Sequence, residues 1–355
     1  MALHKVSIIW VNYNSSKIIQ IALESLESII NLNYPREKYE LIVVDNGSTD
    51  KSYEKIKSFL EKHSDVKWKT IKLEHNLGFN GGNNVGFRAR DKDSLYLLLL
   101  NNDAVLFPDA LDKMIDYAES HSNVAGVQGV ILKYKSNIID SAGDFINEIL
   151  YPYALGMNKP YPWIIRKPMY ITYADGSCSL YRIDYITKCL GNRLFIDEFF
   201  GYADDNVLGL MLWGCNYKLV SIPEVVASHA RGMTFGKKKG SLAFYLGERN
   251  RIALSMITNT RYRRVILAHA LRNLSVSMLR DKLGYESKML SRAIIDGLSL
   301  GEKLRFRGVH IDIYKAPIIR ISPKVIPLFF MSKRVVERYY EKWIQQNLNN
   351  LYVGE

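Results

Sequence analysis

The stretch LYLLLLNNDAVL, at residues 95–106, constrains the fold of this chain more than any other. Its six leading apolar residues run directly into Asn101, Asn102 and Asp103. A short apolar run of this length is typical of a strand that is buried on both faces of a parallel sheet. Open α/β sheets bind their ligands outside the carboxyl ends of such strands. The sequence therefore predicts that Asp103 holds a carboxylate at the mouth of a cleft; the alternative is that these polar residues only turn the chain before Pro108.

Apolar runs and helical segments alternate along the first part of the chain. The runs lie at residues 6–11, 41–44, 68–73, 95–100 and 124–133. Their alternation with helical patterns, over short connections, favours an α/β fold with a mostly parallel, doubly wound sheet and helices on both faces. Residues 136–173 break the pattern with prolines, glycines and aromatic residues, which either line a sugar or lipid site or pack as loops on a core.

The positive charge of the chain is concentrated in its last third. The net charge is +12 over 355 residues. Residues 1–229 carry 24 Lys and Arg against 27 Asp and Glu, whereas residues 230–355 carry 24 against 9. A basic region beside a near-neutral one indicates an anionic partner, either a membrane or nucleic acid. We expect Lys237, Lys238 and Lys239 to add a contact to lipid phosphate.

Three further features concern the location of the protein in the cell. Cys178, Cys189 and Cys215 show neither metal-ligand nor disulfide spacing, which favours a reducing compartment. The N-terminal sequence MALHKVSIIW lacks the pattern of a signal peptide. No apolar run approaches the roughly 20 residues of a membrane-spanning helix. These features predict a cytoplasmic protein.

Residues 264–280 show a strong amphipathic helical pattern. The apolar face consists of Leu267, Leu271, Leu274 and Met278, and the opposite face of His269, Arg272, Asn273 and Arg280. We expect such a helix either to pack on the protein body or to lie at a membrane surface. Residues 325–343 form a second candidate for a surface-bound element.

Several motifs together resemble one enzyme family. In chain order they are VSIIWVNYNSS, VVDNGSTD, NLGFNGGNNVGF, LLLNNDAVLFPDAL, DGSCSLYR, FIDEFFGYADD, Ser228-His229 and YLGERN. In this order and spacing they are similar to the family 2 glycosyltransferases, and most similar to the rhamnosyltransferase-like branch. The resemblance covers residues 6 to about 252. It implies a GT-A fold, a nucleotide-sugar donor, a divalent metal and inversion at the anomeric carbon.

The resemblance also divides the chain into regions. Residues 1–252 would form a GT-A catalytic domain, in which residues 1–135 bind the nucleotide sugar and residues 136–252 bind the acceptor. Residues 253–355 match nothing that we can name and would form a helical, basic C-terminal extension associated with a membrane surface.

The chemistry of sugar transfer explains why a metal is expected. The reaction expels a nucleoside diphosphate, and a divalent cation that bridges its phosphates stabilises the developing charge. Asn101, Asn102 and Asp103 occupy the place of the family's DXD motif, in which Asn101 replaces the first acid. Asn102 and Asp103 would bind the donor, and Asp103 would be the metal ligand. His229 matches the family's histidine after a strand; as a ligand it would favour Mn²⁺ over Mg²⁺, and the alternative is a structural histidine.

An acceptor hydroxyl is a weak nucleophile, so a carboxylate must take its proton as it attacks. Asp204 and Asp205 align with the Glu-Asp pair of the family, whose second member usually lies nearest the acceptor. We therefore predict that Asp205 is the general base. The alternative is that the two acids only begin a helix.

The remaining donor contacts are expected at the ends of the first two strands and beyond. Asn12 and Asn14 follow the first strand. Asp45 ends the second, where its family counterpart accepts a hydrogen bond from the base; the local sequence alone favours a turn residue. Asn83, in the glycine-rich run, would contact ribose or phosphate. Arg249 would pair with the pyrophosphate or is an ordinary surface arginine.

The predicted function is that of an inverting, metal-dependent glycosyltransferase at the inner face of the cell membrane. We expect it to move a sugar from a UDP- or dTDP-sugar to a hydroxyl of a glycan acceptor that is linked to a lipid such as a polyprenyl carrier. A sugar nucleotidyltransferase would carry a glycine-rich, basic signature where Asn12-Tyr13-Asn14 stands here. A nucleic-acid-binding protein is the third alternative, but no motif of that class accompanies the basic charge.

Overall fold

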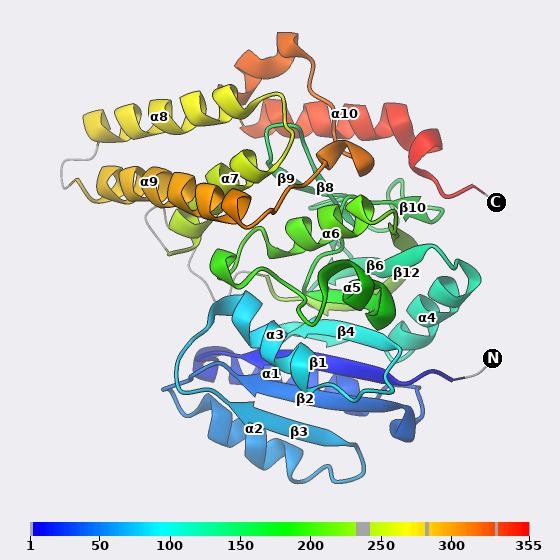
Figure 1. Cartoon of the computed structure of the whole chain (residues 1–355). Coiled ribbons are helices and arrows are strands. Elements are labelled where there is room, and N and C mark those ends of the chain that lie inside the picture. Colours follow the sequence, from blue (N-terminus) through cyan, green and yellow to red (C-terminus); the bar gives the residue numbers. More distant parts are fainter. Residues whose placement is uncertain (1–2, 232–241, 281–283, 331–332, 355) are drawn as a thin grey trace. The chain divides into compact units, whose positions relative to one another are not determined.

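The structure of the chain is a computed structural model that describes residues 3–231, 242–280, 284–330 and 333–354 (Figure 1). The chain forms two compact units. The first, here called the sheet unit, comprises Met1–Asp144 and Ala154–Thr234. The second, the helical unit, comprises Phe145–Tyr153 and Phe235–Glu355. The functional division at residues 135 and 252 stays a prediction.

The first half of the sheet unit is parallel, as the alternating pattern predicts (Figure 1). Its strands are β1 (Val6–Asn12), β2 (Tyr39–Asp45), β3 (Trp68–Lys72) and β4 (Tyr96–Asn101), in the order β4-β1-β2-β3. The helices between them are α1 (Ile19–Ile30), α2 (Ser52–Leu60) and α3 (Gly78–Ala89). The apolar side chains of β1, β2 and β4 are almost entirely buried and form the core. Because Asn12 lies opposite Asp45 and Val11 opposite Asn101, the polar strand ends meet at one edge.

The second half of the sheet is mixed, so the prediction of a mostly parallel sheet is wrong there. Its strands are β5 (Ala104–Leu106), β6 (Val124–Lys133), β7 (Ile139–Ser141), β10 (Met169–Tyr170), β11 (Cys178–Arg182) and β12 (Lys218–His229). The full order is β10-β12-β6-β11-β4-β1-β2-β3, with β5 on β12 and β7 on β6. The short strand β11 inserts between β4 and β6 and pairs antiparallel with both. As a result, β4 and β6 are not adjacent in the sheet, because β11 lies between them.

The region 136–173, expected to be irregular, contains short strands and many buried side chains. Besides β7 and β10 it holds β8 (Asp144–Ile146) and β9 (Pro152–Ala154), which form a separate two-stranded sheet. The remaining helices of the sheet unit are α4 (Ala110–Ser120), α5 (Ile183–Leu190) and α6 (Asp204–Gly214).

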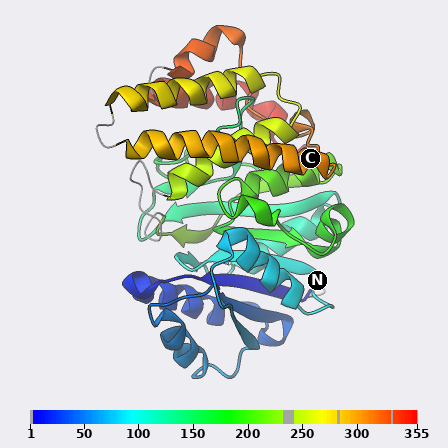
Figure 2. The same cartoon turned by 60° about the vertical axis from the view of Figure 1, so that its left-hand side comes forward.

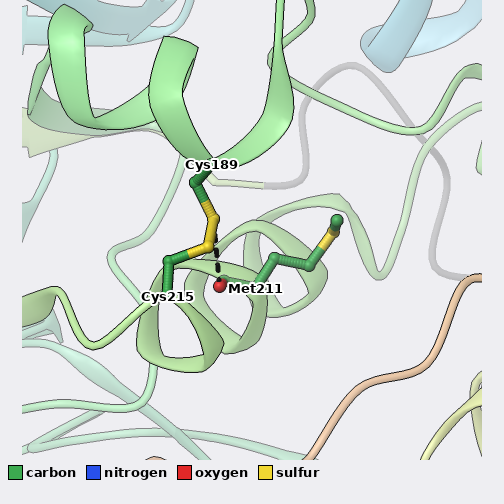
Figure 3. Close-up of a disulfide and its surroundings, with 3 residues drawn as sticks. All are labelled: Cys189, Met211 and Cys215. Atoms are coloured by element: carbon green, nitrogen blue, oxygen red, sulfur yellow. Dashed lines mark hydrogen bonds between the residues drawn. A yellow bond between two sulfur atoms is a disulfide. The ribbon is translucent and has the colours of Figure 1, made fainter.

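A disulfide joins α5 to the end of α6, contrary to the expectation from cysteine spacing (Figure 3). Cys189 lies in the last turn of α5 and Cys215 directly follows α6, with their Cα atoms 6.0 Å apart. Cys178 is free and buried. The 26-residue separation hides the pairing, because only the packing of α5 on α6 brings the two residues together. Cysteine usage therefore no longer supports a reducing compartment.

The helical unit consists mainly of α7 (Leu242–Ile257), α8 (Arg263–Arg280), α9 (Tyr285–Phe306) and α10 (Lys333–Leu351). Helices α8 and α9 run side by side in both views (Figures 1 and 2). The buried carboxylate of Glu148 accepts hydrogen bonds from the N–H of Ile321 at 2.6 Å and from Arg261 at 3.0 Å. No helix within the described ranges is both long and apolar enough to span a membrane.

Helix α8 packs on a face that differs from the predicted one. Its buried residues are Ile266, Ala270 and Ser277, each one position before a predicted apolar residue. One residue corresponds to a rotation of about 100° around a helix. Ala270 packs with Ile252 of α7 and Ile294 of α9, so small residues bring α8 close to its neighbours. Leu267 and Leu274 pack at the border of this cluster, whereas Leu271 and Met278 are exposed.

One predicted membrane contact lies wholly outside the described residues, and a second lies outside them at two positions. Lys237, Lys238 and Lys239 lie outside the described residues. The candidate element 325–343 covers most of a 3₁₀ helix, Pro323–Phe330, and the first half of α10; residues 331–332 lie outside the description.

Candidate active site

Asp103 lies beside the end of β12. The chain leaves β4 at Asn101 and turns into β5, which pairs antiparallel with β12 so that Ala104 lies opposite His229. This register brings Oδ1 of Asp103 to 3.1 Å from Nε2 of His229. The N–H of Ala230 also donates to the carbonyl oxygen of Asp103, at 2.9 Å. The two residues predicted as metal ligands are therefore adjacent, although 126 positions separate them in sequence.

Both ring nitrogens of His229 face carboxylates. Nδ1 lies 2.9 Å from Oδ2 of Asp140, on β7, while Nε2 faces Asp103. Burial lowers the pKa of His229, but the hydrogen bonds with Asp103 and Asp140 outweigh burial and raise the pKa to about 9. The ring is thus fixed in orientation from both sides.

Arg231 extends this group of charges. Its Nε donates to both carboxylate oxygens of Asp140, at 3.0 and 2.8 Å, and its Nη2 donates to Asp175. Burial is the largest influence on the pKa of Asp175 and raises it, but the charges of Arg231 and His229 and the hydrogen bonds from Ser177 together outweigh burial and hold the pKa below its usual value. Sequence reasoning missed Asp140, Arg231 and Asp175. One signal was available, because His229 and Arg231 are alternate residues and alternate side chains of an extended chain share one face.

The donor set at Asp103 fits a divalent cation that is held partly by its substrate. Across the described parts of the chain, no group of three or more His, Cys, Asp and Glu side chains could hold a metal. Asp103 and His229 would supply two ligands, and Mg²⁺-type sites commonly combine one or two carboxylates with substrate phosphates. Asn102 is buried next to this pair.

Asp204 and Asp205 form the first turn of α6. Oδ2 of Asp205 accepts a hydrogen bond from the N–H of Gly176 at 3.0 Å, whereas its buried Oδ1 has no hydrogen-bond partner among the described residues. Burial raises the pKa of Asp204 to about 6. Burial, followed by the charges of Asp204 and Asp175, raises the pKa of Asp205 well above its usual value. One oxygen of Asp205 is therefore fixed by a hydrogen bond, the other is buried without a partner among the described residues, and the pKa of the carboxyl is raised.

The turn that leads into Asp204 has an unusual backbone. Phe200, Tyr202 and Ala203 have φ values of +66°, +60° and +82°, in a region that non-glycine residues rarely adopt. Such conformations cost free energy and persist only where the surroundings enforce them. They cluster at functional sites, which agrees with the position of this turn directly before the acidic pair.

The glycine- and asparagine-rich run of α3 holds this turn in place. Oδ1 of Asn84 accepts hydrogen bonds from the N–H groups of Leu194 and Phe195, at 2.8 and 2.9 Å. Nδ2 of Asn80 donates to the carbonyl of Ile196 at 2.8 Å. A side chain at Gly78 would collide with the carbonyl of Phe200, since an added Cβ would lie 2.1 Å from it. Sequence reasoning assigned this run to the donor and missed its role as a support.

Asn83, the member of that run predicted to touch the donor, points into its own helix. It is buried, and its Nδ2 donates to the carbonyl of Phe79 at 2.9 Å. A contact with ribose or phosphate stays a prediction.

The predicted donor residues at the ends of β1 and β2 bind one another. Asp45 is fully buried and accepts hydrogen bonds from Nδ2 of Asn12 at 2.7 Å and from the N–H of Ser48 at 3.1 Å. Asn14, with a positive φ of 48°, accepts from the N–H of Thr49 at 2.8 Å. The structure thus brings Asn12, Asn14 and Asp45 together as a network that joins two turns. A contact between Asp45 and a base would require that network to open.

Arg249 lies on α7, in the helical unit. Its Nε donates to Oδ1 of Asn250 at 2.8 Å, and its guanidinium lies 5.7 Å from the ring centre of Tyr245. Pairing of Arg249 with a pyrophosphate stays a prediction.

Comparison with known proteins identifies the family. Residues 7–187 match the family model described as glycosyl transferase family 2, and this segment makes up half of the chain. The chain belongs to glycosyl transferase family 2. This segment includes Asp103 and the whole of α3, whereas Asp205 and His229 lie beyond it. The match is to family 2 as a whole, so the rhamnosyltransferase-like branch stays a prediction.

Individual members and solved structures extend the likeness. A Methanococcus voltae protein named as a dolichyl N-acetyl-α-D-glucosaminyl phosphate 3-β-D-2,3-diacetamido-2,3-dideoxy-β-D-glucuronosyltransferase is 25% identical over 235 residues, which cover 63% of this chain and 66% of that protein. A Pyrobaculum calidifontis mannosyltransferase in complex with GDP-Man and Mn²⁺ has a TM-score of 0.53 at 15% identity, covering 99% of this chain and 88% of that one. Staphylococcus aureus TarS 1–349 in complex with UDP-GlcNAc has a TM-score of 0.53 at 17% identity, with 99% and 93% coverage.

At such identities, the solved structures show the fold alone, and they support the GT-A type of α/β fold expected for family 2, with a mixed sheet. The first curated relatives, 31% and 30% identical, share only 40% and 29% of their length with this chain. Family 2 membership nevertheless favours glycosyl transfer over nucleotidyl transfer.

Proposed function

We propose that this family 2 protein is an inverting, metal-dependent glycosyltransferase that uses a nucleoside diphosphate sugar as donor and a glycan hydroxyl as acceptor. The observation that carries the proposal is the pair Asp103 and His229, whose donor atoms lie 3.1 Å apart beside a buried strand end. A second carboxylate, Asp205, offers a buried oxygen without a partner among the described residues. The two features provide a place for a cation and a place for a proton.

In the proposed displacement reaction, different residues bind the metal and accept the proton. Asp103 and His229 would hold the cation, and a bound Mn²⁺ or Mg²⁺ would stabilise the charge of the departing diphosphate. Oδ1 of Asp205 would take the proton from the acceptor hydroxyl. The acceptor oxygen then bonds to the anomeric carbon as the bond from that carbon to the phosphate oxygen breaks. A single displacement of this kind inverts the anomeric configuration.

Two solved structures of similar fold contain a nucleotide sugar. The S. aureus neighbour binds UDP-GlcNAc and the P. calidifontis neighbour binds GDP-Man with Mn²⁺. Both agree with a nucleotide-sugar donor and a divalent metal. A UDP- or dTDP-sugar remains our proposal, with Asn12, Asn14, Asp45, Asn83 and Arg249 as candidate donor contacts.

Release of nucleoside diphosphate tests the activity. Purified protein would be incubated with UDP-, dTDP- and GDP-sugars, with lipid-linked or water-soluble glycan acceptors, and with Mn²⁺, Mg²⁺ or EDTA. We expect metal-dependent release of nucleoside diphosphate and an inverted anomeric signal by NMR. Full turnover in EDTA would contradict the role of the metal. Release of pyrophosphate from a nucleoside triphosphate and a sugar phosphate would instead indicate a nucleotidyltransferase.

We further propose a lipid-linked acceptor and a peripheral position at the inner face of the cell membrane. The M. voltae relative is named for transfer to a dolichyl phosphate-linked sugar. On α8 the exposed apolar residues Leu271, Met278 and Leu279 lie beside exposed Arg272 and Arg280. Apolar and basic side chains together suit an anionic bilayer, where each basic residue contributes about 1 kcal/mol.

Flotation with vesicles tests this position. We expect the protein to float with anionic vesicles at low salt, to stay behind in high salt, and to ignore neutral vesicles, because salt screens surface charges. Leu279→Ser should weaken flotation. Leu95→Ser, at an exposed leucine of the sheet unit, is the matched control. A full-length protein that never floats would refute the proposal.

A further inference from the structure

Three charged side chains continue outward from His229 in an unbroken series of contacts. Asp140 lies 2.9 Å from Nδ1 of His229, Arg231 contacts both oxygens of Asp140, and Asp175 contacts Arg231. The side chain of Asp140 is only 2% exposed. A carboxylate buried to this extent is stable as a charge only if it is paired and hydrogen-bonded. Both of its partners here, His229 and Arg231, come from the end of β12 and the residues just after it.

The contact with Asp140 determines which nitrogen of His229 is available. A histidine that binds a metal usually donates its other ring N–H to a carboxylate or carbonyl, which fixes the tautomer and the ring orientation. With Nδ1–H donated to Asp140, Nε2 is the nitrogen that faces Asp103, and once deprotonated it would offer its lone pair to a cation there. Rotation of the ring would break the contact with Asp140, so Asp140 restrains the ring in the orientation that a cation requires.

Arg231 restrains Asp140 in turn. Its Nε binds both oxygens of Asp140 while its Nη2 reaches Asp175. Only a planar guanidinium, with several donors in a fixed fork, can serve two carboxylates in this way. Lysine would offer a single point charge and could not keep both contacts with the same geometry.

The far end of this series reaches the acidic pair. Asp175 is fixed by its own turn, because its Oδ1 accepts from the N–H of Ser177 at 2.9 Å and its N–H donates to Gln128 at 2.7 Å. The next residue, Gly176, donates its N–H to Asp205. One arginine thus contacts the residue that orients the proposed metal ligand and the turn that orients the proposed base.

We propose that Asp140 and Arg231 are positioning residues for the metal site, with Asp140 holding His229 so that Nε2 faces the cation and Arg231 holding Asp140 against it. This inference rests on the proposed function, because it assumes that Asp103 and His229 bind a divalent metal. The competing account is an ion-pair cluster that only stabilises the fold. If Asp140 and Arg231 position the metal ligand, their loss should lower the metal affinity of the folded protein. If they only stabilise the fold, the metal affinity of the folded protein should stay the same.

The test is the affinity for Mn²⁺, followed by electron paramagnetic resonance of the free ion in titrations of the full-length protein, with and without UDP. Asp140→Asn should weaken Mn²⁺ binding about 10–100-fold, the usual effect of removing a residue that orients a metal ligand. Arg231→Lys should weaken it in the same direction and by less. Circular dichroism melts would establish that each variant is folded.

Matched controls separate positioning from general stability. Asp144→Asn changes another buried carboxylate near Arg231. The carboxylate of Asp144 accepts a hydrogen bond from Ser141 at 2.9 Å. Arg261→Met removes an arginine from the buried carboxylate of Glu148, in the helical unit. We expect both controls to bind Mn²⁺ within about twofold of the parent protein, whatever their melting temperatures.

A double variant sharpens the test. If Asp140 acts through the ring, Asp140→Asn should cause no further loss of Mn²⁺ affinity in a His229→Gln background, because coupled residues are not additive. A folded Asp140→Asn protein with unchanged Mn²⁺ affinity would overturn this inference alone. Equal Mn²⁺ affinity of the parent protein and Asp103→Asn would instead overturn the proposed metal site, and with it the function on which this inference rests.

Discussion

Two groups of predicted site residues in the sheet unit differ in how completely their polar atoms are hydrogen-bonded. At the ends of β1 and β2, Asn12 and Asp45 are fully buried and satisfy each other. At the end of β12 and the start of α6, His229 lies between two carboxylates, and Asp205 keeps a buried oxygen that has no hydrogen-bond partner among the described residues. We expect the first group to support the fold, whereas the second is the group for which we propose metal binding and proton transfer.

The largest effect is expected at Asp103. Asp103→Ala removes one of the two proposed protein ligands of the metal, so transfer should be abolished while the protein stays folded. Nucleoside diphosphate release across a Mn²⁺ titration, with a circular dichroism melt, measures both. Near-normal turnover with unchanged dependence on Mn²⁺ would mean that Asp103 has a structural role and is not a metal ligand.

Asp205 should show the next largest effect. Asp205→Asn is nearly isosteric but cannot accept the proton, so kcat should fall about 10²–10⁴-fold, the usual contribution of general base catalysis. Binding of the donor nucleotide should be retained. The paired variant Asp204→Asn should lose less activity; if it is the inactive one, the two roles are reversed.

The pH dependence of kcat tests whether the buried acidic pair supplies the general base. A general base acts only when deprotonated, and the pKa of Asp204 is raised to about 6 and that of Asp205 well above its usual value. The kcat should therefore rise with pH, with a midpoint at or above about pH 6. Because the two carboxyls are coupled, this apparent pKa belongs to the pair and not to either residue. A limb near pH 4, the usual range of aspartate, would indicate solvated carboxylates.

The same shifts predict an opposite trend in stability. Between the usual aspartate pKa and the raised one, the folded state keeps protons that the unfolded state has lost. The free energy of unfolding should therefore fall as pH rises through that window and level off above it. Asp205→Asn should flatten this dependence in denaturant titrations; an unchanged slope would mean that Asp205 is not the group responsible.

Asp45 should give the smallest effect on turnover and a clear one on stability. Asp45→Ala leaves Asn12 and the N–H of Ser48 without their acceptor, which should lower the free energy of unfolding by about 1–3 kcal/mol. If Asp45 also binds the base, affinity for UDP or dTDP should fall by about 1.5–3 kcal/mol in calorimetry. Unchanged nucleotide affinity with lowered stability would leave Asp45 as a support alone.

Sequence patterns predicted the features that local chemistry determines. The parallel strands β1 to β4 follow from apolar runs and short connections. The motifs named Asp103, His229, Asp204 and Asp205, and the structure places the first two in contact. The insertion of β11, the disulfide and the contacts of Asp140 depend on segments far apart in sequence, which no local pattern reports. On α8 the apolar period was correct, but the buried face follows the small residues Ala270 and Ser277, which allow close packing.

The disulfide between Cys189 and Cys215 encloses the stretch that carries both the strained turn and the acidic pair. A protease that cuts the chain anywhere between Gly191 and Ala203 would therefore leave the two fragments covalently joined. Such a nicked protein would run as one species on a gel until reductant separates it into two. The closed loop also restricts the unfolded chain by about 3–4 kcal/mol in the chain-entropy account. Whether a cleaved chain stays joined at this segment therefore depends on whether the surroundings of the protein are oxidising or reducing.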